Sequence, residues 1–227
     1  KRGMGDVWTL TVDEYVELSK LRQLVYRLYR NPFFMFVVGP VYIFLFDYRF
    51  NRKNASRKER INTYITNFGI VGTGVLLSWL IGWQEFLIIQ GPIFLISGMA
   101  GIWLFYVQHQ FEDTYFEKEE DWNYVKAAVQ GSSFYKLPKI LHWITGNIGF
   151  HHIHHLSPRV PNYYLQRVHN SNTSLQNVQT IGILSSLSSL RFRLWNEDSK
   201  KFVGFREIKG KSLANGESDP LDLLVNK

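Results

Sequence analysis

The chain of 227 residues contains no cysteine. This absence excludes disulfide bonds, thiolate metal ligands and cysteine nucleophiles, so any metal must be bound through nitrogen and oxygen atoms. Negative charge is also scarce, because 19 Asp and Glu stand against 26 Lys and Arg, which gives a net charge of +7. No N-terminal secretory signal is visible, and the chain begins with Lys1 rather than Met. We therefore expect it to be an interior piece of a longer protein.

Charge is missing altogether from two long stretches. Residues 63–84 and 86–108 carry no charged side chain, and each has the roughly 20 apolar residues that a transmembrane helix needs. Glu85 separates them, so we expect a transmembrane helical hairpin. A third uncharged run, residues 33–46, is too short for a straight crossing and is interrupted by Gly39-Pro40. This run is typical of a re-entrant or interfacial segment.

Positive charge borders these apolar runs. Six basic residues lie between Arg49 and Arg60, and the positive-inside rule places them in the cytoplasm. The hairpin then turns outside near Trp83 and returns to the cytoplasm at His109. A nucleic-acid-binding domain would instead carry a basic stripe on a foldable polar surface, so we expect no nucleic-acid partner. The basic residues of 177–227 predict a cytoplasmic tail next to anionic lipid.

Four of the seven histidines lie within five residues, His151–His155. On a helix that turns about 100° per residue, His151, His154 and His155 fall within an arc of about 100°, whereas His152 lies outside it. Three imidazoles on one face indicate a metal site. The same residues also fit a His-rich surface tract, which binds metal without a defined geometry.

A further candidate ligand, His109, lies at the end of the second predicted span, in the same compartment as the cluster. On a continuing helix Glu112 and Asp113 would share its face at i+3 and i+4, where a carboxylate can accept the outer ring N–H of a ligating imidazole. Ordinary juxtamembrane charges explain these two residues equally well. His142, on an apolar stretch, and His169, which stands alone, are given no metal role.

The surroundings of the histidines carry a family resemblance. Gln108-His109, a spacing of about forty residues to the His-His-Ile-His-His motif, the lead-in Gly146–Phe150 and the follow-on Leu156–Tyr163 together resemble the membrane fatty acid desaturases. The likeness is greatest to bacterial acyl-lipid desaturases, including the delta-5 type, and covers roughly residues 1–170.

The resemblance implies an all-α integral membrane fold, with transmembrane helices under a cytoplasmic helical cap that carries the histidine site. In the family, three histidine boxes and one additional histidine hold two irons. By position, His109 corresponds to the additional histidine, and the third box corresponds to His151, His154 and His155. Asn147, in the lead-in, joins Glu112 and Asp113 as a candidate to support the ligands.

Two departures from the family pattern matter. The first two boxes and the two helices before them have no counterpart, so we expect an N-terminally truncated desaturase domain over residues 1–176, inactive by itself, with the cap at 109–176. Relatives of the stearoyl-CoA type place an asparagine four residues before the additional histidine, and here that position is Phe105. This difference favours the acyl-lipid branch.

The resemblance implies a di-iron, oxygen-dependent enzyme that introduces a cis double bond into the acyl chains of membrane lipids. The implied electron donor is ferredoxin-like or flavodoxin-like, and the implied location is the cytoplasmic side of a bacterial cytoplasmic membrane. A related di-iron hydroxylase or ketolase would use the same histidines. A non-redox membrane metal-binding protein is a third hypothesis, although a metal carrier would place ionisable groups within its spans, and these two spans contain none.

Overall fold

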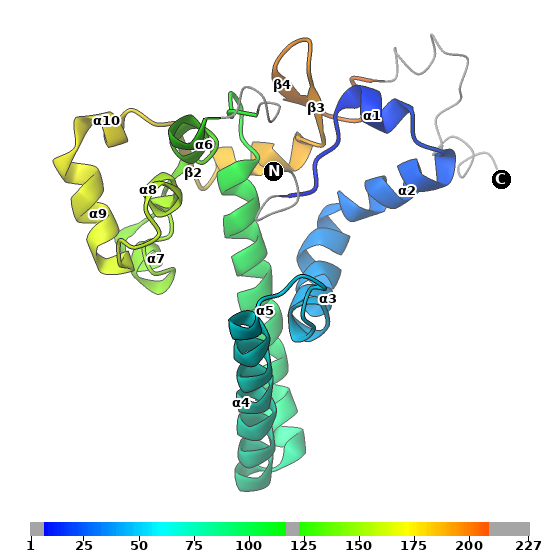
Figure 1. Ribbon diagram of the computed structural model, residues 1–227, viewed down its shortest axis with the longest axis vertical. Coiled ribbons are helices and arrows are strands. Elements are labelled where there is room, and N and C mark those ends of the chain that lie inside the picture. Colours follow the sequence, from blue (N-terminus) through cyan, green and yellow to red (C-terminus); the bar gives the residue numbers. More distant parts are fainter. Residues whose placement is uncertain (1–6, 117–122, 209–227) are drawn as a thin grey trace. The chain divides into compact units, whose positions relative to one another are not determined.

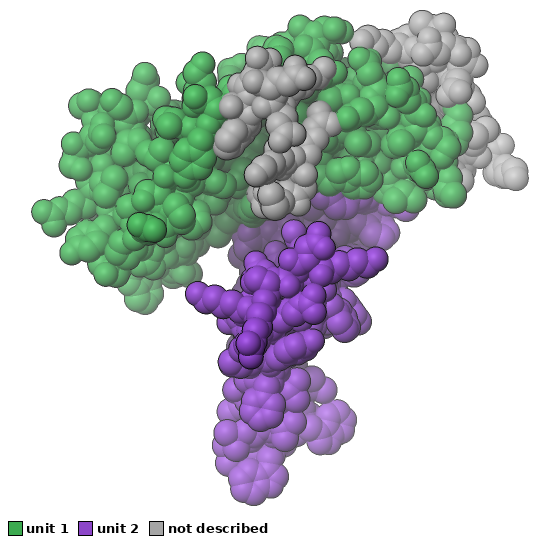
Figure 2. All heavy atoms as spheres, viewed as in Figure 1, with its two compact units in different colours: residues 1–27, 104–227 green, residues 28–103 purple. Residues whose placement is uncertain are grey.

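The computed structural model describes residues 7–116 and 123–208. The chain divides into two compact units, residues 28–103 and residues 1–27 with 104–227, which Figure 2 colours separately. Each unit is described by itself.

The unit of residues 28–103 contains the predicted hairpin, α4 (Arg57–Ile81) and most of α5 (Trp83–His109) (Figure 1). Both helices are long and apolar enough to cross a membrane, so the prediction of two helices capable of spanning it is confirmed. α4 begins earlier than the uncharged run because Ser56 and Glu59 form a capping box, in which each side chain accepts the backbone N–H of the other residue. It ends at Gly82, whose φ of +96° favours glycine.

The apolar run before α4 is helical throughout. A π-helical turn (Phe34–Val38) passes directly into α3 (Gly39–Leu45), and a 3₁₀ turn (Asp47–Arg49) follows. The expected break at Gly39-Pro40 is wrong, because Gly39 N–H donates to Phe34 O and Pro40 occupies the first turn of α3, where a missing N–H costs little. This run is long and apolar enough to cross a membrane only when it is joined to α2 (Lys20–Tyr29), and the two helical segments are bent by 65° relative to each other. A re-entrant segment therefore stays a prediction.

The second unit is a cap of short elements. Its parallel strands β1 (Phe134–Lys136) and β2 (Thr180–Gly182) pair Tyr135 with Ile181. β3 (Leu194–Asn196) pairs with β4 (Lys201–Val203) in an antiparallel hairpin. The helices of this unit are α1 (Val12–Val16), α6 (Tyr124–Gln130), α7 (Lys139–Ile144), α8 (His151–Leu156), α9 (Asn162–Ser171), α10 (Thr173–Gln176) and a 3₁₀ helix (Ser185–Arg191). Over residues 7–116 and 123–208 the fold is mostly helical, as predicted, with four short strands in addition.

The predicted basic tail is folded over residues 177–208. Leu194 and Val203 are buried together with Tyr26, whose hydroxyl donates to the carbonyl of Arg193. Each of β3 and β4 buries two adjacent residues of its three, and Lys201 is exposed. This part of the predicted tail is therefore folded, and its contact with anionic lipid stays a prediction. Residues 209–227 of the predicted tail lie outside the described residues.

A second apolar core lies under the histidine motif. Phe150 and Ile153 are buried against Leu165 of α9 and Leu175 of α10. Since Ile153 lies in the middle of α8, this core fixes the face that the helix buries and so the face that its histidines present.

Candidate metal centre

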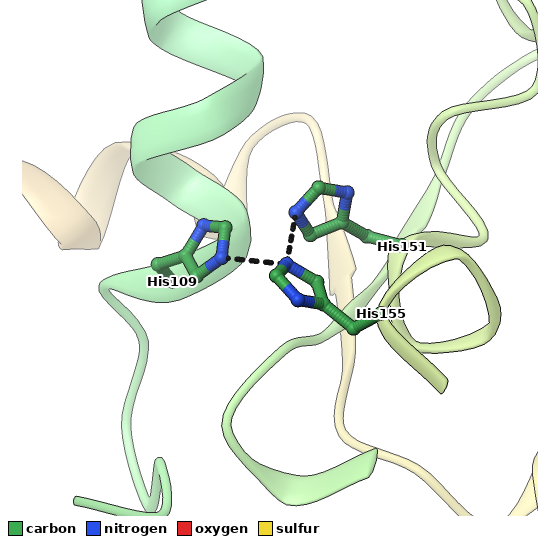
Figure 3. Close-up of side chains that lie close together, drawn as sticks. All are labelled: His109, His151 and His155. Atoms are coloured by element: carbon green, nitrogen blue, oxygen red, sulfur yellow. Dashed lines mark hydrogen bonds between the residues drawn. The ribbon is translucent and has the colours of Figure 1, made fainter. Parts of the chain in front are cut away.

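Three imidazole rings from two distant parts of the cap sequence meet at one point (Figure 3). His155 Nε2 lies 3.0 Å from His109 Nε2 and 3.0 Å from His151 Nε2. One ligand nitrogen from each ring lies within 4.8 Å of the other two. Among residues 7–116 and 123–208, this is the only group of three or more His, Cys, Asp or Glu side chains that meets so closely.

Helix geometry explains the convergence. His109 is the last residue of α5, and His151 and His155 lie one turn apart on α8, so both rings project from the same face. α8 packs against α6 and α9 (Figure 1). The hydroxyl of Tyr124 on α6 lies 2.8 Å from the carbonyl oxygen of His155 and 3.0 Å from that of Leu156. This contact was not predicted from the sequence, where Tyr124 has no distinguishing pattern.

The turn before α8 is tightly constrained. Tyr135 N–H of β1 donates to Gly149 O at 2.8 Å, and a Cβ atom at Gly149 would lie 2.5 Å from Tyr135 O. Asn147 has a positive φ of 57°, and its side-chain amide donates to the carbonyl of Asn162 at 3.2 Å. The structure therefore places Asn147 in the turn that leads into α8, where its side chain supports the backbone and not a ligand ring.

The hydrogen bonds of His109 determine which of its ring nitrogens is free. Nδ1 lies 2.8 Å from Phe105 O. A carbonyl oxygen only accepts, so Nδ1 carries the proton, and the lone pair of Nε2 is left facing the other two rings. Backbone carbonyls commonly orient metal-ligating imidazoles in this way.

His151 is also held in the form that binds metals. Its side chain is 6% exposed. Burial, reinforced by the neighbouring His109, His155 and His154, holds the pKa of His151 far below its usual value. The ring is therefore neutral at pH 7, which metal coordination requires.

The spacing of the nitrogens fits a bound metal ion. With metal–nitrogen bonds of about 2.1 Å, neighbouring ligand atoms lie about 3.0 Å apart at a right angle and about 3.4 Å apart at a tetrahedral angle. The two observed distances of 3.0 Å match the first value. His155 Nε2 has either a proton or a lone pair, so it cannot make good hydrogen bonds to both neighbours, whereas one cation can bind all three nitrogens.

His154 and His152 lie outside this group. The ring centroid of His154 is 5.8 Å from that of His151 and 6.0 Å from that of His155, because a helical step of three residues places it on the opposite side of His151 from His155. His152 is completely buried, and its Nε2 lies 3.4 Å from Nδ1 of His169. Burial, together with the neighbouring His169, lowers the pKa of His152 to about 4.

His142 and His169 contribute to the aromatic packing behind α8. The ring of His142 stacks on Phe150 at 5.0 Å, and the ring of His169 contacts Phe134 at 4.9 Å. His169, which stands alone in the sequence, is paired with His152 by the fold. Sequence spacing gives no signal for that pair, which depends on how α9 crosses α8.

The expected support from Glu112 and Asp113 is also wrong. α5 ends at His109, so the shared helical face at i+3 and i+4 does not form. Both side chains are exposed, and Asp113 lies 3.8 Å from Lys201 Nζ. The helix ends here because the next residues turn into the cap, where Phe111 is buried.

Comparisons with known proteins agree with this geometry. The family described as "Fatty acid desaturase" matches residues 5–177. A "Fatty acid desaturase" of Bacillus subtilis (strain 168) is 62% identical over 209 residues, which are 92% of this chain and 59% of that protein. An "Omega-6 fatty acid desaturase, chloroplastic" of Glycine max is 36% identical over 56 residues, which are 25% of this chain and 13% of that protein.

The chain therefore spans less than two thirds of the length of either relative. Within the matched residues lie both candidate spans, His109 and the whole His151–His155 motif. With the match extending over most of its length and through the converging histidines, this chain belongs to the fatty acid desaturase family.

Proposed function

We propose that the protein introduces a cis double bond into fatty acyl chains in an oxygen-dependent reaction at a di-iron centre. The observation that carries this proposal is the convergence of three Nε2 atoms from α5 and α8 in a family named for desaturation. His109, His151 and His155 would bind iron directly, and His154, whose ring lies next to that of His151, is proposed as a ligand of the same centre.

Iron bound at this site would supply the oxygen activation that an unactivated methylene group requires, and zinc, which has no redox chemistry, would not. The role of the protein residues is to keep this site dry and neutral. Phe105 O holds the proton of His109 on Nδ1, and burial keeps His151 neutral. Further ligands would come from segments that correspond to the part of the Bacillus subtilis relative outside the matched 59%.

The proposed substrates are acyl chains of membrane phospholipids. Two helices with the length and composition of membrane spans support this choice, since the histidine site begins at the last residue of one of them. Phe105, in place of the asparagine of stearoyl-CoA-type relatives, also favours lipid-bound acyl chains. Molecular oxygen and a ferredoxin-like or flavodoxin-like electron donor complete the proposed set of partners.

The proposed location is a bacterial cytoplasmic membrane, with the active site on the cytoplasmic side. The six basic residues between Arg49 and Arg60 precede α4 directly, and the positive-inside rule assigns such a cluster to the cytoplasm. α4 and α5 then form one outward and one returning span, so His109 would lie at the cytoplasmic surface.

The test is fatty acid profiling of a bacterial host that expresses the full-length protein. We expect new unsaturated fatty acids with the wild type and none with His155→Ala or His109→Ala. The matched control is His142→Phe, which keeps an aromatic ring in the stack on Phe150 and leaves the three converging nitrogens unchanged.

Other products would contradict the proposal. Hydroxylated or oxo products in place of new double bonds would identify a hydroxylase or ketolase. Full activity of His155→Ala would rule out the site itself, and purified active protein containing zinc but no iron would rule out the redox centre.

A further inference from the structure

Two stretches of the cap expose apolar side chains that no described residue covers. Three lie on α7 at i, i+3 and i+4, and three lie at the end of β2 and the start of the following 3₁₀ helix. These side chains are 45% to 83% exposed. We call them the rim residues: Ile140, Trp143, Ile144, Ile183, Leu184 and Leu187.

The small parallel sheet brings both stretches to one edge. β1 and β2 run in the same direction, and their last residues, Lys136 and Gly182, are paired. α7 begins at Lys139, just beyond the end of β1, and Ile183 directly follows β2. Because parallel strands end at the same edge of a sheet, the two groups of rim residues emerge together.

Both stretches are also fastened to the last turn of α5 within the cap. The hydroxyl of Tyr106 lies 2.9 Å from Ser189 O, in the 3₁₀ helix that carries Leu187. On the other side, His142 of α7 stacks on Phe150, which directly precedes α8, and His155 of α8 meets His109. These contacts link both groups of rim residues to the last turn of α5, a candidate membrane span.

The residues around the rim suit a lipid surface. Lys136 and Lys139 are exposed beside α7, and Arg191 is exposed at the end of the 3₁₀ helix. Neither residues 134–144 nor residues 180–191 contain an acidic side chain. Basic residues next to exposed apolar ones are attracted to anionic lipid headgroups. Tryptophan is enriched at the membrane–water interface, where an amphipathic ring is partly buried and partly hydrated.

We propose that the rim residues insert into the headgroup boundary of the leaflet in which α5 ends, with a lipid bilayer as their partner. Polar headgroups occupy about 5–8 Å on each side of the hydrocarbon core, a depth that side chains on the surface of the cap can reach. Insertion holds α7 and α8 against the membrane, so that the three converging histidines stay at the leaflet surface. This inference depends on the membrane location of α5 and not on the metal chemistry.

The absence of cysteine makes the inference directly testable. Trp143→Cys and Leu184→Cys would carry nitroxide spin labels in the full-length protein, with any cysteine outside these 227 residues replaced by serine. The protein is reconstituted into vesicles of phosphatidylethanolamine and phosphatidylglycerol. Ser199→Cys, exposed in the β3–β4 hairpin, is the matched control.

Collision rates with oxygen, which concentrates in lipid, and with a water-soluble nickel chelate report where each label lies. We expect labels at 143 and 184 to collide several-fold more with oxygen than with nickel, and the label at 199 to show the reverse. Nickel collisions at 143 and 184 equal to those at 199 would place the rim in water. Low collision rates with both reagents would mean that protein covers it, either a second copy or another part of the chain. Either result would overturn the proposal.

Discussion

Gly149 offers a sharp test of how the backbone positions the three converging histidines. It is buried two residues before His151. A Cβ atom there would lie 2.5 Å from Tyr135 O and 2.6 Å from His142 Cε1. Ordinary carbon contacts need about 3.5 Å, so the Gly149→Ala substitution demands a displacement of roughly 1 Å. Tyr135 O belongs to the backbone of β1 and cannot rotate away, so the start of α8 must move.

The size of the effect follows from this clash. Overpacking a close-packed site costs about 1–3 kcal/mol, and the lower chain entropy of alanine in the unfolded state returns about 0.4–1 kcal/mol. We expect a net loss of about 1–2 kcal/mol in the free energy of unfolding. If about 1.4 kcal/mol of the strain is carried by the shifted ligands, metal affinity falls about tenfold.

The assay compares purified full-length proteins after dialysis against a chelator. Iron per polypeptide is measured by mass spectrometry, and thermal unfolding in detergent is followed by tryptophan fluorescence. Gly182→Ala is the matched control, since a Cβ atom there would meet only Ser185 Oγ, at 3.7 Å. If Gly149→Ala retained as much iron and the same melting temperature as Gly182→Ala, the argument that this turn sets the ligand positions would be wrong.

Three further predictions concern the site and the spans. Tyr124→Phe removes the hydroxyl contacts to two α8 carbonyls, so thermal unfolding should report a loss of about 0.5–1.5 kcal/mol, with iron content unchanged. His152 stays neutral in the fold down to about pH 4, whereas it becomes protonated below about pH 6.5 when unfolded. Acidification over this window should therefore cost metal-free wild type at most about 3 kcal/mol more than His152→Gln in denaturant titrations. A reporter fused at Trp83 should be extracellular and one at Lys53 cytoplasmic, and both on one side would exclude the hairpin.

The two spans were predictable because a bilayer imposes a rule that is visible in the sequence. Every backbone polar group within lipid must be paired inside its own helix, and charged side chains are excluded. Residues 63–84 and 86–108 obey both conditions. The helix ends were less predictable: α4 starts at Arg57, within the basic cluster, because the Ser56 capping box sets its first turn.

The folded part of the predicted tail could not be read from the sequence. β2, β3 and β4 have three residues each, too few for an alternating pattern to stand out from the surrounding basic residues. Their pairing depends on partners far along the chain, as when Ile181 pairs with Tyr135 of β1. Tertiary contacts of this kind decide the structure of short segments whose own preference is weak.

Within the site, helical periodicity predicted that His151 and His155 share a face, and the structure places their Nε2 atoms 3.0 Å apart. The same periodicity grouped His154 with them, but an arc of about 100° is wide enough to hold residues on both sides of His151. Only the position of His109 shows which side faces the end of α5. That position depends on the packing of the whole cap.

Support for His109 comes from the backbone, so its ring needs no carboxylate partner. The acceptor of its Nδ1–H is Phe105 O, four residues earlier on the same helix. Every residue type supplies this carbonyl, which has a second lone pair in addition to the one used by the helix. The orientation of the His109 ring therefore does not depend on the side chain of residue 105. The carboxylates of Glu112 and Asp113 are then free to remain at the surface, and desolvating them would have cost more than the carbonyl does.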